Sequence, residues 1–574
     1  MQKRTVMMSA AAVLSLSALL AGCSSSIGGS SAAAPRHAAI PNGGTIVQAI
    51  PTKFGANMIP LLDSSYYTAW IDSYQFDSLL QFDQKDNLIG DLVNKWWYSK
   101  DRTTIFFHIN PKAKWSNGKP VTSADVKLGV DWLTSKTYVN TDQGSYEYLV
   151  QNILGASKPL PDGQTPSGFK VISPSEFSMT MASPDAAVLP SMWSGIQPLP
   201  VSVLGKIPMK DWKNSSVNKI FPVGSGPFIM TSVNEGQSVT MKANPYYLFG
   251  KPHIEYNIFK VISPDTVDGG LASGQVQVGE IHAKDYASVK KMPGLGVGIV
   301  PENGFSYLGW RLNNATYGKE FSNLKFRQAV EYAINRNAIV AAIDKGFGAP
   351  ENGPLPPINH WYNKSLNGAY AYSPVKANAL LNAAGFKIKN GWRTTPDGKP
   401  FTPTITYASG NSNDTILATF IQQFLQAVHI NVKVNPPLDF NTIINDLNND
   451  ANGKQPIQGF LLAWSLSNDP DPRGLWRASD NLNTTSIDWT NTKDPAVKLN
   501  DQLIHLQHTA AAFDISYRQN ILNRWQTLLS QQMPENFLTN DSRLVAYSTK
   551  LKGVVFSPYA YGYVAFPNRW YLSK

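Results

Sequence analysis

The chain contains a single cysteine, Cys23, so it folds without disulfide bonds. Two basic residues near the start precede an apolar stretch from Val6 to Leu20, which ends in Leu20-Ala21-Gly22-Cys23. This stretch is too short to cross a bilayer, and a small-residue cleavage site follows it, as in a secretory signal peptide. We therefore predict that residues 1–22 are the signal peptide of an exported bacterial lipoprotein and that Cys23 is the lipidation site. An ordinary signal peptide with an incidental cysteine is the alternative.

Residues 23–42 are rich in Ser, Gly and Ala and are predicted to be a flexible tether, so the folded body begins near Gly43. The remaining length of about 530 residues allows two to four domains. The chain is 43% hydrophobic and 11% aromatic, which suffices for a large core. No second apolar run approaches the ~20 residues that cross a bilayer. We expect the body to be held to a membrane only through its lipid.

Charged residues are sparse: they make up 16% of the chain, against about 25% in typical domains. Only 40 are acidic, which leaves a formal net charge of +10. Lys and Arg form no run of five, so nucleic-acid binding is not predicted. Attraction to an anionic cell surface remains open. Acid adaptation also remains open, because few carboxylates would lose their charge as the pH falls.

Strands and helices alternate along the chain, which predicts an α/β architecture. β-forming residues over 104–110 predict a strand, and Asn117-Gly118 predicts a turn after it. Thr122 and Asp125 have the spacing of a capping box at a helix start. Further helices are predicted over 323–346, 373–385, 416–428 and 517–528, and a strand is predicted over 430–434.

The sequence lacks the common catalytic patterns. It has no Walker loop, no G-x-S-x-G motif and no HExxH motif, and we expect His505 and His508 to be structural or surface residues. One enzyme alternative is a serine penicillin-recognising enzyme, because Ser116 and Ser288 each begin an S-x-x-K motif and Ser479-Asp480-Asn481 fits S-D-N. No K-T-G follows these motifs. We therefore predict a protein that is not an enzyme and that needs no cofactor or metal.

The block from Trp96 to Val126 carries the strongest family signal. It contains Phe106-Phe107-His108-Ile109, Trp115-Ser116-Asn117-Gly118-Lys119-Pro120 and Thr122-Ser123-Ala124-Asp125-Val126. Further blocks follow in order: Pro198-Leu199-Pro200, Pro222 to Phe228, Asn244-Pro245-Tyr246-Tyr247, Leu271 to Val276, Arg327 to Val330, Tyr332 to Arg336, and Ala379 to Phe386. Together they resemble the family 5 extracellular solute-binding proteins, which are the oligopeptide- and dipeptide-binding components of ABC importers.

This resemblance implies a two-lobed α/β fold like that of periplasmic binding proteins, with one additional domain. By resemblance, lobe I comprises residues 43–74, 201–303 and 547–574, the extra domain comprises residues 75–200, and lobe II comprises residues 304–546. The implied mechanism is hinge closure around a ligand between the lobes.

The resemblance also points to a ligand-binding segment. In the resembling proteins, a G-W segment followed by Asp lines the cleft; its backbone pairs with an extended peptide, and the Asp receives the peptide amino terminus. The matching residues here are Ala463, Trp464, Ser465, Leu466, Ser467, Asn468 and Asp469. Ala463 replaces the usual Gly, and the spacing after Trp464 is one residue longer. Asn468 therefore competes with Asp469 for the anchoring position, and a plain turn role for Asp469 stays open.

The resemblance thus implies an extracytoplasmic lipoprotein that captures short peptides and delivers them to the permease subunits of an ABC transporter. We expect a monomer, attached to the bacterial cell membrane by its lipid and without a nucleic-acid partner. The same transport role with an oligosaccharide, a nickel chelate or haem as cargo is the alternative, because a fold alone does not fix a ligand.

Overall fold

The computed structural model describes residues 40–63, 65–83, 87–142, 144, 146–190, 196–449 and 457–573. Residues Pro41–Lys574 form one compact unit. Cys23, the predicted signal peptide and most of the predicted tether lie outside the described residues. None of the helices in this described part has the length and hydropathy to cross a bilayer.

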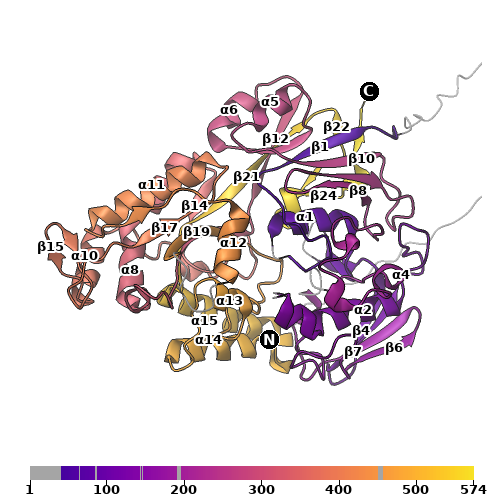
Figure 1. Cartoon of the computed structure of the whole chain (residues 1–574), viewed down its shortest axis with the longest axis horizontal. Coiled ribbons are helices and arrows are strands. Elements are labelled where there is room, and N and C mark those ends of the chain that lie inside the picture. The colour runs from indigo at the N-terminus through magenta and orange to yellow at the C-terminus, as the bar shows by residue number, and fades with distance from the viewer. Residues whose placement is uncertain are drawn as a thin grey trace, which may run out of the picture. The chain divides into compact units, whose positions relative to one another are not determined.

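An eight-stranded mixed sheet is built around β1 (Thr45–Ile50), which pairs in parallel with β10 and β11 (Figure 1). The strand order is β12-β21-β11-β1-β10-β9-β8, and β14 extends it by pairing with β21. The other strands are β8 (Phe228–Asn234), β9 (Ser238–Ala243), β10 (Tyr256–Val261), β11 (Val278–Ile281), β12 (Leu295–Pro301), β14 (Gly348–Pro350) and β21 (Thr539–Ser548). We call this sheet with its helices lobe I.

A five-stranded sheet forms a second body, lobe II, in the order β18-β17-β19-β13-β20. Its strands are β13 (Gly304–Trp310), β17 (Thr404–Thr406), β18 (Lys433–Val434), β19 (Gly459–Ser465) and β20 (Glu535–Phe537). Two short connections join the sheets directly, from β12 to β13 and from β20 to β21, and between β13 and β17 the chain also returns to the sheet of lobe I at β14. The two direct connections span only a few residues each.

A four-stranded antiparallel sheet with α2 (Ser123–Thr134) forms a third body, which we call the four-stranded domain. Its strands are β4 (Val93–Tyr98), β5 (Thr104–Ile109), β6 (Phe169–Ser173) and β7 (Glu176–Thr180). Its apolar core extends beyond Pro200 to Leu204, Trp212 and Phe221. The predicted division into lobes remains a prediction at the level of residue boundaries, and the boundary between 546 and 547 falls inside β21.

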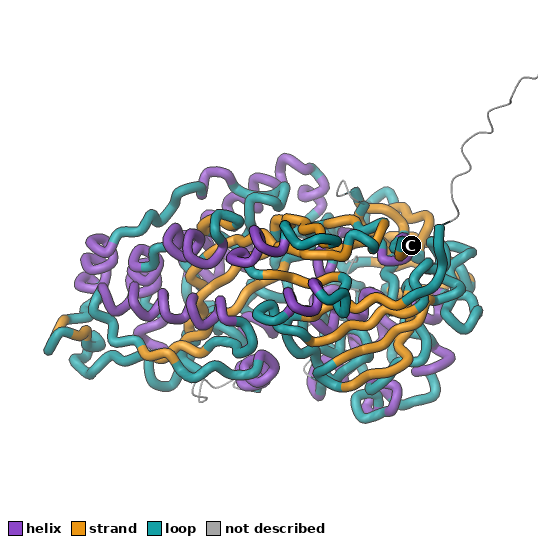
Figure 2. Tube along the Cα trace, turned by 90° about the horizontal axis from the view of Figure 1, so that it is seen from above, coloured by secondary structure: helices purple, strands orange, loops and turns teal. Residues whose placement is uncertain are grey.

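Helices gather at the end of the molecule away from the C-terminus, whereas the end that carries the C-terminus is richer in strands (Figure 2). The helices are α1 (Tyr66–Gln75), α4 (Val201–Leu204), α5 (Val267–Ala272), α6 (Tyr286–Val289), α7 (Gly318–Phe321), α8 (Leu324–Ala333), α9 (Arg336–Ile339), α10 (Pro374–Ala383), α11 (Ser412–Ala427), α12 (Phe440–Asn448), α13 (Asn481–Thr485), α14 (Pro495–Leu506) and α15 (Ile515–Gln532). Four two-stranded ribbons complete the described strands: β2 (Leu80–Phe82) with β3 (Leu88–Gly90), β15 (Ile388–Lys389) with β16 (Trp392–Arg393), β22 (Leu551–Lys552) with β25 (Tyr571–Leu572), and β23 (Val555–Phe556) with β24 (Val564–Ala565).

Several local predictions are confirmed. The strand expected over 104–110 is β5, and the Thr122–Asp125 capping box opens α2, with the Asp125 carboxylate accepting from the Thr122 N–H at 2.8 Å. The helices expected near 373–385, 416–428 and 517–528 are α10, α11 and α15.

Two local predictions are confirmed only in part. The single helix expected over 323–346 breaks after α8, because Ile334 takes an extended conformation and Asn335 caps a new helix by accepting from the Ala338 N–H at 3.0 Å. The strand expected over 430–434 pairs only at Lys433 and Val434, because its neighbour β17 is three residues long. A side-chain cap and a short partner strand both override periodicity here.

Candidate ligand-binding site

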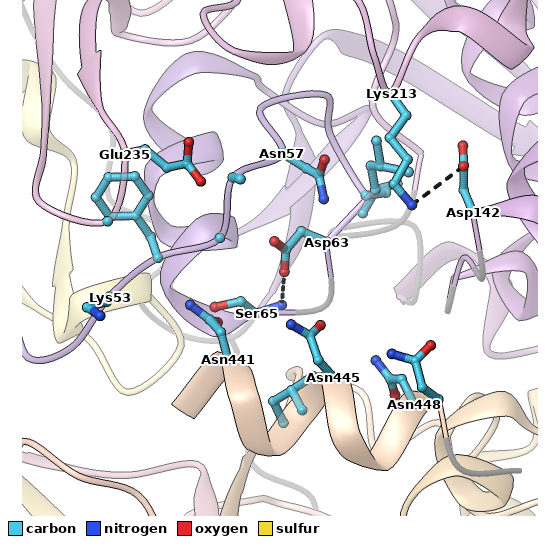
Figure 3. A pocket seen from close by; sticks show the side chains of 18 of the residues that line it. Lys53, Asn57, Asp63, Ser65, Asp142, Lys213, Glu235, Asn441, Asn445 and Asn448 are labelled. Carbon is cyan, nitrogen blue, oxygen red and sulfur yellow. Dashed lines mark hydrogen bonds and ion pairs between the residues drawn. The ribbon is translucent and has the colours of Figure 1, made fainter. Parts of the chain in front are cut away.

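A cavity of about 690 Å³ lies between the loop that follows β1 and helix α12 (Figure 3). The loop belongs to lobe I, because Phe54 and Met58 pack in the same apolar cluster as β1. Helix α12 belongs to lobe II, because Ile443 and Leu447 pack in the core that surrounds the five-stranded sheet. The cavity therefore lies between the lobes, and its size is within the range of about 300–1,000 Å³ usual for small-ligand sites.

Helix α12 presents a row of amides to the cavity. Asn441, Asn445 and Asn448 recur at helical spacing and line the cavity, while Ile443 and Leu447 on the opposite face are buried. Asparagine is a weak helix former, because its side chain competes for backbone hydrogen bonds. Each amide offers both a donor and an acceptor to a ligand.

The charges around the cavity are largely paired. Lys53 Nζ lies 3.1 Å from a carboxylate oxygen of Asp439, the N-cap of α12, and Lys213 Nζ lies 3.6 Å from a carboxylate oxygen of Asp142. Asp63 also lines the cavity, and its carboxylate accepts from the Ser65 N–H at 2.8 Å. Burial raises the pKa of Asp63 above its usual range, although the bonds from Ser65 and Thr68 oppose the shift.

The two lobes touch each other at more than one place. Tyr67 of α1 meets Phe440 of α12 edge to face, with ring centroids 6.1 Å apart. The Ser412 hydroxyl and N–H, at the start of α11 in lobe II, donate to Asp265 in lobe I at 2.5 and 3.0 Å. Lobes I and II are thus in direct contact, and the Tyr67–Phe440 contact lies next to Asn441 of the cavity wall.

The predicted segment 463–469 begins in β19, which runs antiparallel to β13. Trp464 stacks on Tyr307, with ring centroids 5.7 Å apart and planes within 6°, and its indole N–H donates to Glu535 at 2.9 Å. Burial raises the pKa of Glu535 to about 8. Trp464 is therefore fixed by packing and by a hydrogen bond, while the side chains of Ala463 and Ser465 are exposed.

The other edge of β19 is open over most of its length. Among the described strands, β17 pairs with β19 only at Gly459 and Phe460, because β17 ends at Thr406. Residues Leu461–Ser465 thus keep one backbone edge away from β13 without a strand partner in the described structure. Beyond them, the Leu466 N–H donates to the Asn303 carbonyl at 2.7 Å, and the Asn303 amide donates to the carbonyls of Leu466 and Ser467.

Asp469 has a partner that the sequence did not reveal. Its two carboxylate oxygens each accept from Arg518 of α15 at 2.7 Å, and both side chains are almost fully buried. The Arg518 guanidinium also lies 4.9 Å from the centre of the Trp361 ring. Asn468 beside it is buried as well. The role predicted for Asp469, receiving a peptide amino terminus, stays untested, but this ion pair already occupies its carboxylate.

The next residues of the segment tie lobe II to the four-stranded domain. Arg473 lies 2.7 Å from Asp185 and 2.5 Å from Asp471, and His508 lies 2.9 Å from Asp185. Burial alone would raise the pKa of Asp185, but Arg473 and His508 hold it well below its usual range. Burial and Arg473 lower the pKa of His508, but Asp471 and Asp185 together raise it above its ordinary value. This group of four side chains agrees with the structural role expected for His508.

The serine motifs of the enzyme alternative sit in separate local structures. Ser116 lies in the turn before α2, where its hydroxyl accepts from the Gly224 N–H at 3.3 Å. Ser288 is in α6 and donates to the Asp285 carbonyl. Asp480 accepts from the backbone N–H groups of Gly474 and Arg477. No group of three or more His, Cys, Asp or Glu in the described residues is arranged to hold a metal ion.

Sequence reasoning missed the Asn441-Asn445-Asn448 row, Asp63 and Arg518. The asparagine row could have been predicted from the sequence, because its spacing places three amides on one face of a short helix whose other face is apolar. Asp63 and Arg518 had none, because their roles depend on contacts between segments far apart in the chain.

The family model described as bacterial extracellular solute-binding proteins, family 5, matches residues 87–486. The chain belongs to this family. Among its relatives, the oligopeptide-binding protein AppA of Bacillus subtilis is 24% identical over the whole of both chains. A putative ABC transporter peptide-binding protein of Brucella ovis is 27% identical over 94% of this chain and 96% of its own.

Solved structures share the fold. AppA of Bacillus subtilis in complex with a nonapeptide has a TM-score of 0.80 at 22% identity, covering 93% of this chain and 100% of that one. Lactococcal OppA, complexed with an endogenous peptide in the closed conformation, has a TM-score of 0.79 at 19% identity, covering 92% and 99%. NikZ from Campylobacter jejuni, in complex with Ni(L-His), has a TM-score of 0.77 at 22% identity, covering 92% and 99%. The predicted family and two-lobed α/β fold are therefore confirmed: this chain is an extracellular solute-binding protein.

Proposed function

We propose that this protein captures short peptides in the cavity between lobes I and II and delivers them to the permease subunits of an ABC transporter. The observation that carries the proposal is the open backbone edge of β19 at Leu461–Ser465 in a chain of this family. An extended peptide adds to such an edge through main-chain hydrogen bonds, which every peptide can form whatever its side chains.

The chemistry of the cavity supports a peptide ligand. The amides of Asn441, Asn445 and Asn448 suit a ligand that alternates donors and acceptors, as a peptide main chain does. None of the described residues that line the cavity belongs to the segment 463–469. In the proposal, the open edge of β19 is a second contact surface for the peptide, with the exposed side chains of Ala463 and Ser465 and the stacked ring of Trp464 beside it. AppA and OppA, which share the fold, were solved with peptides bound.

Capture and release require the lobes to part. The two short connections, between β12 and β13 and between β20 and β21, are places where a hinge can act. Opening breaks the contacts beside the cavity, including Lys53–Asp439 and Tyr67–Phe440. A ligand that contacts both lobes adds favourable contacts that exist only in the closed state. Ligand binding therefore favours the closed state.

We also propose that the mature protein is a monomer outside the cytoplasm, anchored to the cell membrane by a lipid on Cys23, and that it binds its cargo without converting it. The lipobox Leu20-Ala21-Gly22-Cys23 supports the anchor. A nickel chelate is the second candidate cargo, because NikZ, which has the same fold, was solved with Ni(L-His) bound.

Calorimetry on the purified protein tests the peptide assignment. Pools of peptides of defined length, an oligosaccharide pool, Ni(L-His) and haem are titrated separately. The proposal predicts saturable binding of a peptide pool, with the peptides recovered unchanged after long incubation. Binding of only the chelate, the sugar or haem would assign another cargo, and cleaved peptide would indicate an enzyme.

A further inference from the structure

The cavity contains a carboxylate that no ion pair neutralises in the described residues. Lys53 pairs with Asp439, and Lys213 pairs with Asp142, so both lysines that line the cavity are engaged. The acidic residues left on its wall are Asp63, which is partly buried, and Glu235, which is exposed. A partly buried charge is screened less by solvent than an exposed one, so Asp63 interacts more strongly with a ligand cation.

The backbone holds Asp63 in place. The Ser65 N–H donates to its carboxylate at 2.8 Å, and the Gly55 N–H donates to the Thr68 hydroxyl at 2.8 Å. A Cβ added at Gly55 would lie 1.6 Å from an oxygen of Asp63, so only glycine at that position leaves room for the carboxylate. Figure 3 shows the Asp63 side chain in the cavity, facing the helix that carries Asn441 and Asn445.

Asp469, in contrast, is poorly placed to receive a new cation. Both its oxygens already accept from the Arg518 guanidinium, and its exposed surface is 4%. An ammonium bound there would have to displace or share a buried guanidinium.

We propose that Asp63, and not Asp469, binds the primary ammonium group of the ligand, which for a peptide without lysine is its amino terminus. This inference rests on the proposed peptide cargo. The ammonium sits on the lobe I side of the cavity and hydrogen-bonds the Asp63 carboxylate, while the amides of α12 on the lobe II side contact the peptide main chain. Closure of the lobes brings the two sets of contacts together on one ligand.

The consequence for pH follows from the surroundings of Asp63. Ammonium binding needs the ionised carboxylate, and burial raises the pKa of Asp63. The neighbouring Asp72, buried on α1, has its pKa raised well above the usual range by burial and by Asp63. The Ser65 N–H and the Thr68 hydroxyl oppose the shift, and Lys53 and Lys213 are engaged by other carboxylates. Affinity for a free amino terminus should therefore fall as the pH drops through the raised pKa, whereas affinity for an acetylated peptide should stay flat.

Calorimetry with a lysine-free peptide that binds the wild type, and with its N-acetylated form, tests the assignment. Acetylation should weaken binding to the wild type by about tenfold to a hundredfold, the loss of one charge-assisted hydrogen bond. Asp63→Asn, which keeps an oxygen for the Ser65 N–H, should weaken the free peptide by the same factor and abolish the difference between the two forms. A second acetylated peptide with one internal lysine shows whether a side-chain ammonium occupies the same place.

Two matched variants locate the effect. Glu235→Gln changes the other carboxylate of the cavity that has no ion pair in the described residues, and Asp469→Asn changes the residue that the sequence suggested as the amino-terminal anchor. In both variants, acetylation should weaken peptide binding as much as it does in the wild type. Circular dichroism checks that each variant is folded, and the wild-type pH profile needs no variant at all. A penalty that persists in Asp63→Asn, or that disappears in Asp469→Asn, overturns the proposal. If peptides bind but acetylation changes nothing, only the anchor is wrong; if no peptide binds the wild type, the proposed function itself fails.

Discussion

The ion pair between Asp469 and Arg518 should matter for stability more than for ligand affinity. The exposed fractions of the two side chains are 4% and 5%, and two hydrogen bonds of 2.7 Å join them. Removing one partner leaves the other charge buried without compensation, which costs about 3–5 kcal/mol. Asp469→Asn and Arg518→Met should therefore each lower the free energy of unfolding of lobe II by that amount.

Replacing both partners gives the matched control. The double variant Asp469→Leu/Arg518→Met buries no lone charge, so it should recover most of the loss. Urea unfolding gives the free-energy differences, and hydrogen exchange of the segment after Trp464 shows whether they arise in lobe II. The reasoning would be refuted if the free energy of unfolding of each single variant lay within about 1 kcal/mol of the wild type. It would also be refuted if the double variant were as unstable as the worse single variant. Either result would mean that the two buried charges do not depend on each other.

Three further outcomes follow from the same structure. His508 has a raised pKa in the folded protein, so its contribution to stability is fully present below its unfolded pKa of about 6.5 and is lost as the pH rises through the folded pKa. The melting temperatures of wild type and His508→Gln should therefore differ most on the acid side, and a difference that grows toward pH 9 would contradict this. Asn445→Leu removes one amide from the cavity and should weaken peptide binding by about twofold to tenfold without unfolding α12, whereas Thr442→Leu on the exposed side of the same helix should not; equal losses in both would show that the helix, and not its amide row, matters. Cys23→Ser should leave the body folded but release it from the membrane fraction, and complete retention of the variant there would disprove the lipid anchor.

Local structure was largely predictable from the sequence because its causes are local. The Thr122–Asp125 capping box joins residues three positions apart, and the start of α10 at Ser373-Pro374 rests on a neighbouring cap and a proline. The break at Ile334 was not predictable from periodicity, since the apolar spacing continues through it while the Asn335 side chain caps a new helix.

The site was predictable only in part. Trp464 and its neighbours could be found because they form one segment with a family pattern. The structure places Trp464 in the part of β19 that extends beyond its pairing with β17. The partner of Asp469 lies 49 residues away, and Asp63 lies 377 residues before the start of α12 at Phe440 (440 − 63), so no spacing along the chain revealed the ion pair or the shared cavity. Ion pairs and cavities between segments of this separation exist only once the lobes have folded and met.

The cargo is the central claim, and the ligand that the protein retains on purification tests it most directly. The full chain is expressed in a bacterial host, and the protein is purified under native conditions. The protein with its retained ligand is then weighed intact by mass spectrometry, and the released ligand is fragmented. The account predicts that the bound mass resolves into short peptides with free amino termini and that Asp63→Asn retains less of them. A retained oligosaccharide, metal chelate or haem would contradict the account.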